Sequence, residues 1–133
     1  MAFLIDSDIL IYSLKGDARV AANFLKHETE PKYISVISYG ELLFGAYHSQ
    51  KTEKNLAIVY KLRSLFRLLE VDQAVIEIFS KLKAQNRKTG QIVDDMDLLI
   101  AATALCNNLT LVSNNEKHFK GIPGLSLKNW HTA

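Results

Sequence analysis

The sequence has few of the features that would indicate a particular compartment or cofactor. It contains a single cysteine, Cys106, so no disulfide can form within the chain and a reducing, cytoplasmic setting is expected. No apolar run approaches the roughly 20 residues that a membrane-spanning helix needs. The four histidines lack the spacing of a zinc site, and neither common glycine-rich phosphate loop is present. A disulfide scaffold, a membrane protein, a zinc site and a kinase-type loop are therefore not expected.

The composition is that of an ordinary globular domain. Hydrophobic residues make up 48% and charged residues 23% of the 133 positions. No internal repeat or linker divides the chain, so one domain spanning residues 1–133 is predicted. The formal net charge is +2, from 16 Lys and Arg against 14 Asp and Glu, and this balance neither requires nor excludes a nucleic-acid partner.

Short apolar runs alternate with longer helical periods along the chain. This alternation is typical of an α/β fold, in which a central parallel sheet is covered by helices on both faces. Strands are predicted at residues 2–6, 33–37, 67–71, 109–112 and 125–127. Helices are predicted at residues 7–14, 16–30, 38–47, 52–66, 73–88 and 96–106.

Three carboxylates stand where apolar strands give way to helices: Asp6, Glu41 and Asp97. The carboxyl ends of parallel strands share one crevice, so these acids are expected to converge. Converging carboxylates repel one another by roughly 4 kcal/mol per pair at 4 Å and an effective dielectric constant near 20. A hard divalent cation with oxygen ligands offsets that repulsion, and Mg²⁺ or Mn²⁺ fits this ligand set.

Each acid also has a purely structural interpretation, because an acid at a helix start caps free N–H groups and complements the helix dipole. Glu41 fits a capping box with Ser38. However, Ser7, Ser38 and Asp94 already supply a short polar residue near each helix start. The three acids are then redundant as caps, and a shared ligand is the better explanation.

A magnesium-binding acid cluster usually serves phosphate chemistry. The cation polarises phosphoryl oxygens and lowers the pKa of a bound water. A carboxylate within hydrogen-bond reach can accept that water's proton. Without a glycine-rich phosphate loop, hydrolysis of a phosphodiester is favoured over kinase chemistry.

Two further groups of residues suggest surfaces. Basic residues in two helical regions are expected to be solvated or to contact an RNA backbone; they are Lys51, Lys54, Lys61, Arg63, Arg67, Lys81, Lys83, Arg87 and Lys88. One short helix carries too many large apolar residues for a single buried stripe, so part of it is expected to pack against a second subunit or a protein partner. These residues are Tyr39, Leu42, Leu43, Phe44 and Tyr47.

The order of the motifs resembles that of PIN-domain nucleases. Residues 3–12, 35–42 and 97–105 resemble the three acidic motifs of that family. Residues 111–115, His118-Phe119, residues 122–125 and Trp130 are similar to the closing signature of VapC toxins. The resemblance implies a PIN-like fold and a Mg²⁺- or Mn²⁺-dependent endoribonuclease. It also implies a homodimeric toxin of a type II toxin–antitoxin pair, whose VapB antitoxin places its tail in the active-site groove.

The resemblance assigns roles to individual residues. It implies that Asp6, Glu41 and Asp97 are the metal ligands and catalytic acids of this chain. It also implies that Ser7, Ser113 and Asn115 orient groups in the site. Asn115 stands where many PIN domains carry a fourth Asp, so it is expected to orient a water or phosphate and a second metal site is expected to be weak. Asp8 replaces a frequent Asn and is expected to reach the metal through water.

Other classes remain as alternatives. Asp6-Ser7-Asp8 after a first strand also resembles haloacid-dehalogenase-like phosphatases, although no later Lys or cap segment is evident. A receiver domain would need an acceptor Asp after the third strand, where this chain has Asp72 following Glu70-Val71. A non-catalytic PIN domain that only binds RNA or a protein partner is the third alternative, because an altered fourth acid can accompany lost activity.

Overall fold

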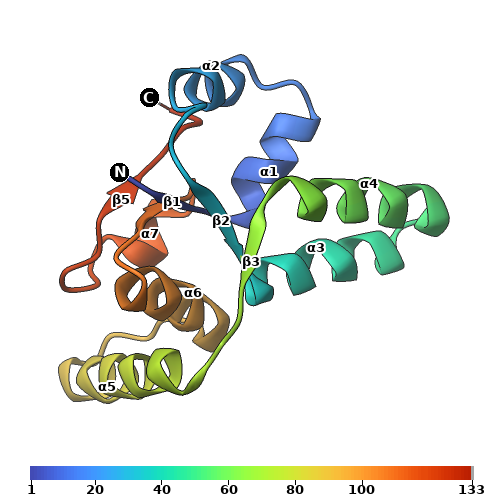
Figure 1. Cartoon of the computed structure of the whole chain (residues 1–133). Helices are drawn as coiled ribbons and strands as arrows, with labels where there is room; N and C mark the ends of the chain where they lie inside the picture. Colours follow the sequence, from blue (N-terminus) through green and yellow to red (C-terminus); the bar gives the residue numbers. More distant parts are fainter. Residues whose placement is uncertain (133) are drawn as a thin grey trace.

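The computed structural model describes residues 1–132, and its centre is a five-stranded parallel sheet (Figure 1). The strand order is β3-β2-β1-β4-β5, which confirms the predicted α/β fold. The strands are β1 (Phe3–Ile5), β2 (Lys32–Ser35), β3 (Arg67–Leu69), β4 (Thr110–Val112) and β5 (Leu127–Lys128). The helices are α1 (Ser7–Leu14), α2 (Ala18–Lys26), α3 (Val36–His48), α4 (Thr52–Leu65), α5 (Gln73–Thr89), α6 (Asp95–Cys106) and α7 (Glu116–Phe119).

The central strand β1 separates two hydrophobic cores. Leu4 packs in one core with residues of α5, α6 and α7. Phe3 and Ile5 point to the opposite face and pack with residues of α1, α2, α3 and α4. Because β1 is fully buried and paired on both sides, the residue that follows it lies at the middle of the sheet's carboxyl edge.

Several helix ends lie where the sequence predicts them because their capping residues are explicit. Asp17 accepts a hydrogen bond from Val20 N at 2.9 Å at the start of α2. Helix α5 begins after Asp72 and ends at Gly90, whose φ of 77° is in the left-handed region. No helix within residues 1–132 is long and apolar enough to cross a membrane.

The boundary between β2 and α3 differs from the prediction. Residues 36 and 37 were assigned to the strand, but α3 begins at Val36 and Ser35 is its N-cap, accepting from Ile37 N at 2.9 Å. The capping box of Ser38 and Glu41 is therefore wrong, since Ser38 lies inside the helix. Two β-branched residues after a buried strand favour the strand pattern, whereas the serine cap decides the actual boundary.

Two elements near the end of the chain also differ. Helix α7 was not predicted, because four residues are too few to show a helical period. Strand β5 comprises residues 127–128 and pairs with β4, rather than occupying residues 125–127.

Candidate active site

Asp6 follows the central strand and is almost fully buried, with 5% of its surface exposed. Its Oδ1 accepts hydrogen bonds from Ser7 N at 2.8 Å and from the Ser38 hydroxyl at 3.3 Å. Its Oδ2 accepts from the Ser113 hydroxyl at 2.8 Å. Asp6 thus caps α1, and the expectation that it is redundant as a cap is wrong. Burial raises the pKa of Asp6, and the negative charge of Asp97 adds to that rise.

Glu41 lies in the second turn of α3 and faces the same crevice. Its Oε1 accepts a hydrogen bond from the Ser7 hydroxyl at 3.2 Å. Partial burial raises the pKa of Glu41 to about 7, and the charges of Asp6, Asp97 and Asp8 contribute to the shift. The carboxyl of Glu41 can therefore hold or release a proton near neutral pH.

Asp97 lies in the first turn of α6, after the N-cap residue Asp94. The side chain of Asp94 makes no capping hydrogen bond, so neither acid serves α6 in that way. Asp97 Oδ2 lies 2.6 Å from His118 Nδ1, and the Asn115 amide nitrogen lies 2.8 Å from the same ring atom. Asn115 thus contacts Asp97 through His118, a residue to which sequence reasoning assigned no role in the site.

The predicted residues meet at one edge of the sheet. Asp6 follows β1, Ser113 follows β4, and Glu41 and Asp97 extend from α3 and α6, close enough for their charges to affect one another's proton affinity. As the side chains stand, no three His, Cys, Asp or Glu residues among residues 1–132 are grouped tightly enough to hold a metal ion. Glu41 is the exposed member of the acidic trio, so its side chain has the freedom to close on an ion.

Asp8 is a fourth acid beside this edge. Its Oδ2 accepts from Asn114 N at 3.0 Å, whereas its Oδ1 is fully buried and has no hydrogen-bond partner among the described residues. Burial raises the pKa of Asp8 to about 6, and the neighbouring charge of Asp6 adds to the shift. An orphaned buried carboxylate oxygen is costly without a proton or a cation nearby.

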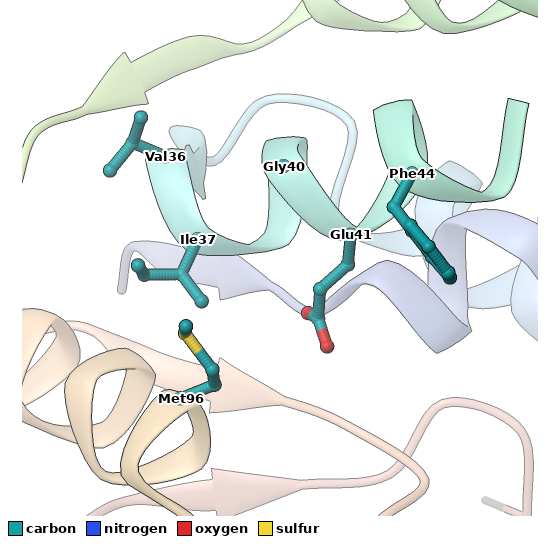
Figure 2. A pocket seen from close by; sticks show the side chains of 6 residues that line it. All are labelled: Val36, Ile37, Gly40, Glu41, Phe44 and Met96. Atoms are coloured by element: carbon teal, nitrogen blue, oxygen red, sulfur yellow. The ribbon is translucent and has the colours of Figure 1, made fainter. Parts of the chain in front are cut away.

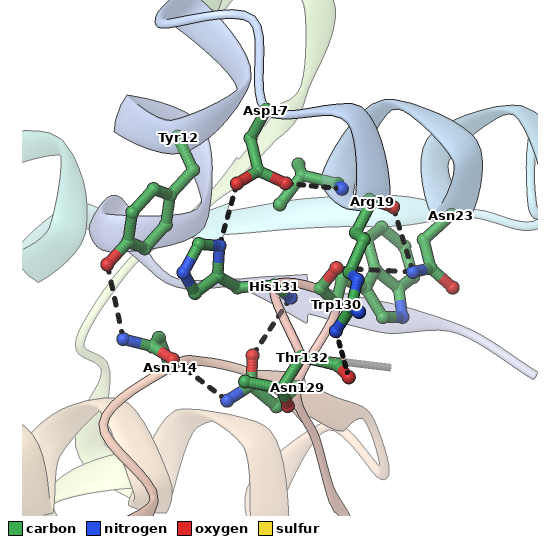
Figure 3. Close-up of polar contacts among 10 residues, drawn as sticks. Tyr12, Asp17, Arg19, Asn23, Asn114, Asn129, Trp130, His131 and Thr132 are labelled. Atoms are coloured by element: carbon green, nitrogen blue, oxygen red, sulfur yellow. Dashed lines mark hydrogen bonds and ion pairs between the residues drawn. The ribbon is translucent and has the colours of Figure 1, made fainter.

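The last residues of the chain brace the loop after β4 (Figure 3). Asn129 donates to Asn114 Oδ1 at 2.9 Å, and Asn114 in turn donates to the Tyr12 hydroxyl at 3.3 Å. The His131 ring stacks on Tyr12 with ring centroids 3.8 Å apart, and its Nδ1 lies 2.8 Å from Asp17 Oδ2. This network was not predicted, because Asn and His at these spacings carry no local pattern.

An apolar cavity of about 400 Å³ opens beside Glu41, between α3 and α6 (Figure 2). Met96 of α6 points towards Ile37 of α3. Glu41 and Phe44 also extend from α3. The lining residues are Val36, Ile37, Gly40, Glu41, Phe44 and Met96. Glu41 thus belongs both to the acidic edge and to the lining of this apolar cavity.

Several known proteins are similar to this chain in sequence and fold. The PIN domain family model matches residues 3–125. Ribonuclease VapC2 of Rickettsia felis is 30% identical over 132 residues, which cover 98% of each chain. The tRNA(fMet)-specific endonuclease VapC of Shigella flexneri is 28% identical over 130 residues, again 98% of each chain. The crystal structure of Rickettsia felis VapBC2 bound to a promoter DNA fragment superposes with a TM-score of 0.91 at 30% identity, covering 98% of this chain and 99% of that one.

The match to the family model extends over nearly the whole chain and includes all three acids, Asp6, Glu41 and Asp97. Identity to the named ribonucleases is spread over their full length, and the solved relative has the same fold. The chain therefore belongs to the PIN-domain family and, within it, to the VapC ribonucleases.

Proposed function

We propose that the chain is a metal-dependent endoribonuclease that hydrolyses RNA phosphodiester bonds and acts as the toxin of a VapBC-type pair. The observation that carries this proposal is the gathering of Asp6, Glu41 and Asp97 from three separate elements at the carboxyl edge of the sheet. Burial raises the pKa of Asp6 and of Glu41, and repulsion from the neighbouring acids adds to both shifts. Such an arrangement costs stability unless a cation or a proton compensates it.

The side chains at this edge suit Mg²⁺ or Mn²⁺. They offer carboxylate oxygens, which are the ligands that hard divalent cations prefer. Asp6, Glu41 and Asp97 would hold the ion, and the orphaned Oδ1 of Asp8 lies beside them as a further acceptor for a water. When bound, such an ion polarises a phosphoryl oxygen and lowers the pKa of a water.

The chain's own residues supply proton transfer and orientation. Glu41, which faces the acidic edge and is held by the Ser7 hydroxyl, would accept the proton of the attacking water at a carboxylate oxygen. The Ser7 hydroxyl holds Glu41 Oε1, while Ser38 and Ser113 hold the two oxygens of Asp6. Buried hydroxyl partners of this kind fix a carboxylate in one orientation before the substrate arrives.

The proposed partners are a VapB-type antitoxin and a second copy of the chain. The antitoxin proposal is supported by the solved relative, a VapBC complex. The homodimer proposal is supported by large exposed apolar side chains on α3 and α4, among them Phe44 at 68% and Tyr47 at 62% exposure.

Asparagine substitution of the acids tests the proposed activity. Asp6→Asn and Asp97→Asn should each lower RNA cleavage by ~10²-fold or more in the presence of Mg²⁺. Asp95→Asn is the matched control, because Asp95 lies in the same turn of α6 but is exposed and pairs with Lys83 at 3.1 Å. Cleavage by either of the first two variants at the control's rate would contradict the proposal.

One alternative remains within the PIN-domain family. If the wild-type chain binds RNA but releases no cleaved product with Mg²⁺ or Mn²⁺, the non-catalytic PIN domain is correct.

A further inference from the structure

A chain of hydrogen-bonded groups in the segment from Ser113 to His118 joins Asp6 to Asp97. The Ser113 hydroxyl donates to Asp6 and accepts from Asn115 N at 3.0 Å. The Asn115 amide contacts the His118 ring, and that ring contacts Asp97. One short segment between β4 and the end of α7 therefore holds two of the three acids.

The contact between His118 and Asp97 has a defined direction. Both Asp97 Oδ2 and the Asn115 amide approach the same ring nitrogen, Nδ1. A carboxylate only accepts hydrogen bonds, so Nδ1 must carry a proton and donate it to Asp97. A nitrogen that donates to Asp97 cannot also accept from an amide N–H, which favours the Asn115 side chain with its carbonyl oxygen towards the ring.

The ring of His118 is not packed in the core, so its position is set by the backbone of α7. Its side chain is 52% exposed, whereas the Asp97 side chain is 14% exposed. The next residue, Phe119, is buried and anchors α7 in the core. The fold thus fixes the backbone of His118 through its neighbour and leaves its ring to contact the carboxylate.

We propose that His118 is a positioning residue that donates from Nδ1 to Oδ2 of Asp97 and so holds this carboxylate in an orientation in which it would bind a divalent cation. This inference rests on the proposed metal-dependent activity. Asn115, which stands where many PIN domains carry a fourth Asp, contacts the His118 ring and helps to hold it in place. A donor that holds a ligating carboxylate typically contributes 10–100-fold to metal affinity or activity, as an order of magnitude.

The test uses Mn²⁺ binding to the full chain without RNA, followed by electron paramagnetic resonance, together with RNA cleavage. His118→Ala should weaken Mn²⁺ binding by about 10–100-fold and lower cleavage similarly at limiting metal. His118→Asn should restore binding, because the amide nitrogen of that side chain occupies the position of Nδ1. His118→Gln should not, because its amide nitrogen lies one bond further from the backbone. Lys117→Ala, on the same helix, is the control for binding.

Each outcome is informative. If Asp97→Asn abolishes Mn²⁺ binding while His118→Ala does not change it, the inference is wrong and the proposed function stands. If His118→Ala binds Mn²⁺ more tightly, His118 competes with the ion and the positioning role is wrong. If the wild-type chain binds no Mn²⁺ and Asp97→Asn cleaves RNA normally, the proposed function itself fails. Unfolding curves of the five variants identify any loss that comes from misfolding, and rescue of Mn²⁺ binding by His118→Asn then distinguishes positioning from misfolding.

Discussion

The Ser113 hydroxyl donates to Oδ2 of Asp6 at 2.8 Å, although the two residues are 107 positions apart. Both lie at carboxyl ends of neighbouring parallel strands, where Ile5 of β1 is in register with Val112 of β4. Ser113 is completely buried and Asp6 nearly so. A hydrogen bond to a charged group in such surroundings is worth more than a surface one, because water does not replace a lost partner.

Replacement of this hydroxyl should therefore affect both stability and activity. Ser113→Ala leaves Asp6 Oδ2 and Asn115 N without a partner, so the free energy of unfolding should fall by about 1–3 kcal/mol. Urea denaturation measures this fall, and RNA cleavage should decrease in parallel. Ser80→Ala, whose exposed hydroxyl bonds only to Ile76 O, is the control and should change stability by less than about 0.5 kcal/mol. Equal stability of the two variants would argue against the role of Ser113.

The acids should make stability depend on pH in a defined direction. The pKa of Glu41 is raised to about 7 from 4.5, so the folded state binds its proton more tightly than the unfolded state. Without metal, the free energy of unfolding should therefore fall as pH rises from about 4.5 to about 7. In Glu41→Gln this fall should be smaller, although Asp6 and Asp8 preserve part of it.

Urea denaturation at a series of pH values checks the effect of Glu41. Glu77→Gln, on the exposed face of α5, should follow the wild type. Added Mg²⁺ should reduce the fall in the wild type, because an ion that binds only the folded state stabilises it. If the free energy of unfolding of the wild type and of Glu41→Gln depended on pH in the same way, the pKa of Glu41 would not be raised in the folded state.

Asn129 should secure the end of the chain against the loop after β4. It is buried, donates to Asn114 and Glu116, and accepts from His131 N at 2.9 Å. Asn129→Ala should lower the free energy of unfolding by about 1–3 kcal/mol. It should also accelerate hydrogen exchange at the His131 amide. Asn107→Ala, at the exposed end of α6, should leave exchange at His131 unchanged, and unaltered exchange in both variants would contradict the bracing role.

The exposed aromatic face of α3 and α4 should mediate self-association. Tyr47 is 62% and Tyr60 50% exposed, and the nearby Tyr47 hydroxyl raises the pKa of Tyr60, so the two side chains lie close together. Tyr47→Glu places a charge in this face and should convert a homodimer to a monomer in size-exclusion chromatography with light scattering. Leu25→Glu on α2, equally exposed, should remain dimeric. A monomeric wild type, or a dimeric Tyr47→Glu, would exclude this interface.

The sequence predicts those parts of the fold that local chemistry controls. The start of α2 and both ends of α5 follow from Asp17, Asp72 and Gly90, whose side chain or backbone preference acts within one helical turn. The predicted end of α2 at residue 30 is wrong, since this helix ends at Lys26. The α3 boundary was misplaced because Val36 and Ile37 have strand propensity, and a single serine hydroxyl outweighs it. A helix boundary is thus predicted correctly when the capping residue and the propensities of the adjacent residues indicate the same position, and it is misplaced when they indicate different positions.

The candidate site was predictable only in part. The rule that parallel strands bring their carboxyl ends together locates Asp6, which directly follows β1. Glu41 lies in the second turn of α3, and Asp97 lies on α6, which follows α5 and not a strand, so the prediction that each acid stands at a strand end is wrong for Asp97. The roles of Ser38 and His118 depend instead on contacts across 32 and 21 positions, which no motif encodes. Asp6 shows the remaining difficulty, since it is both a helix cap and a buried member of the acidic group, and the two interpretations are not exclusive.

The strand order has a consequence for synthesis on the ribosome. Until residues 110–112 have been synthesised and pair with β1, this strand can pair only with β2, and Asp6 lacks the hydrogen bond from Ser113. A nascent or truncated chain that ends before this point cannot assemble the acidic edge. The acidic edge is therefore incomplete during most of translation and can assemble only after the fourth strand has been synthesised.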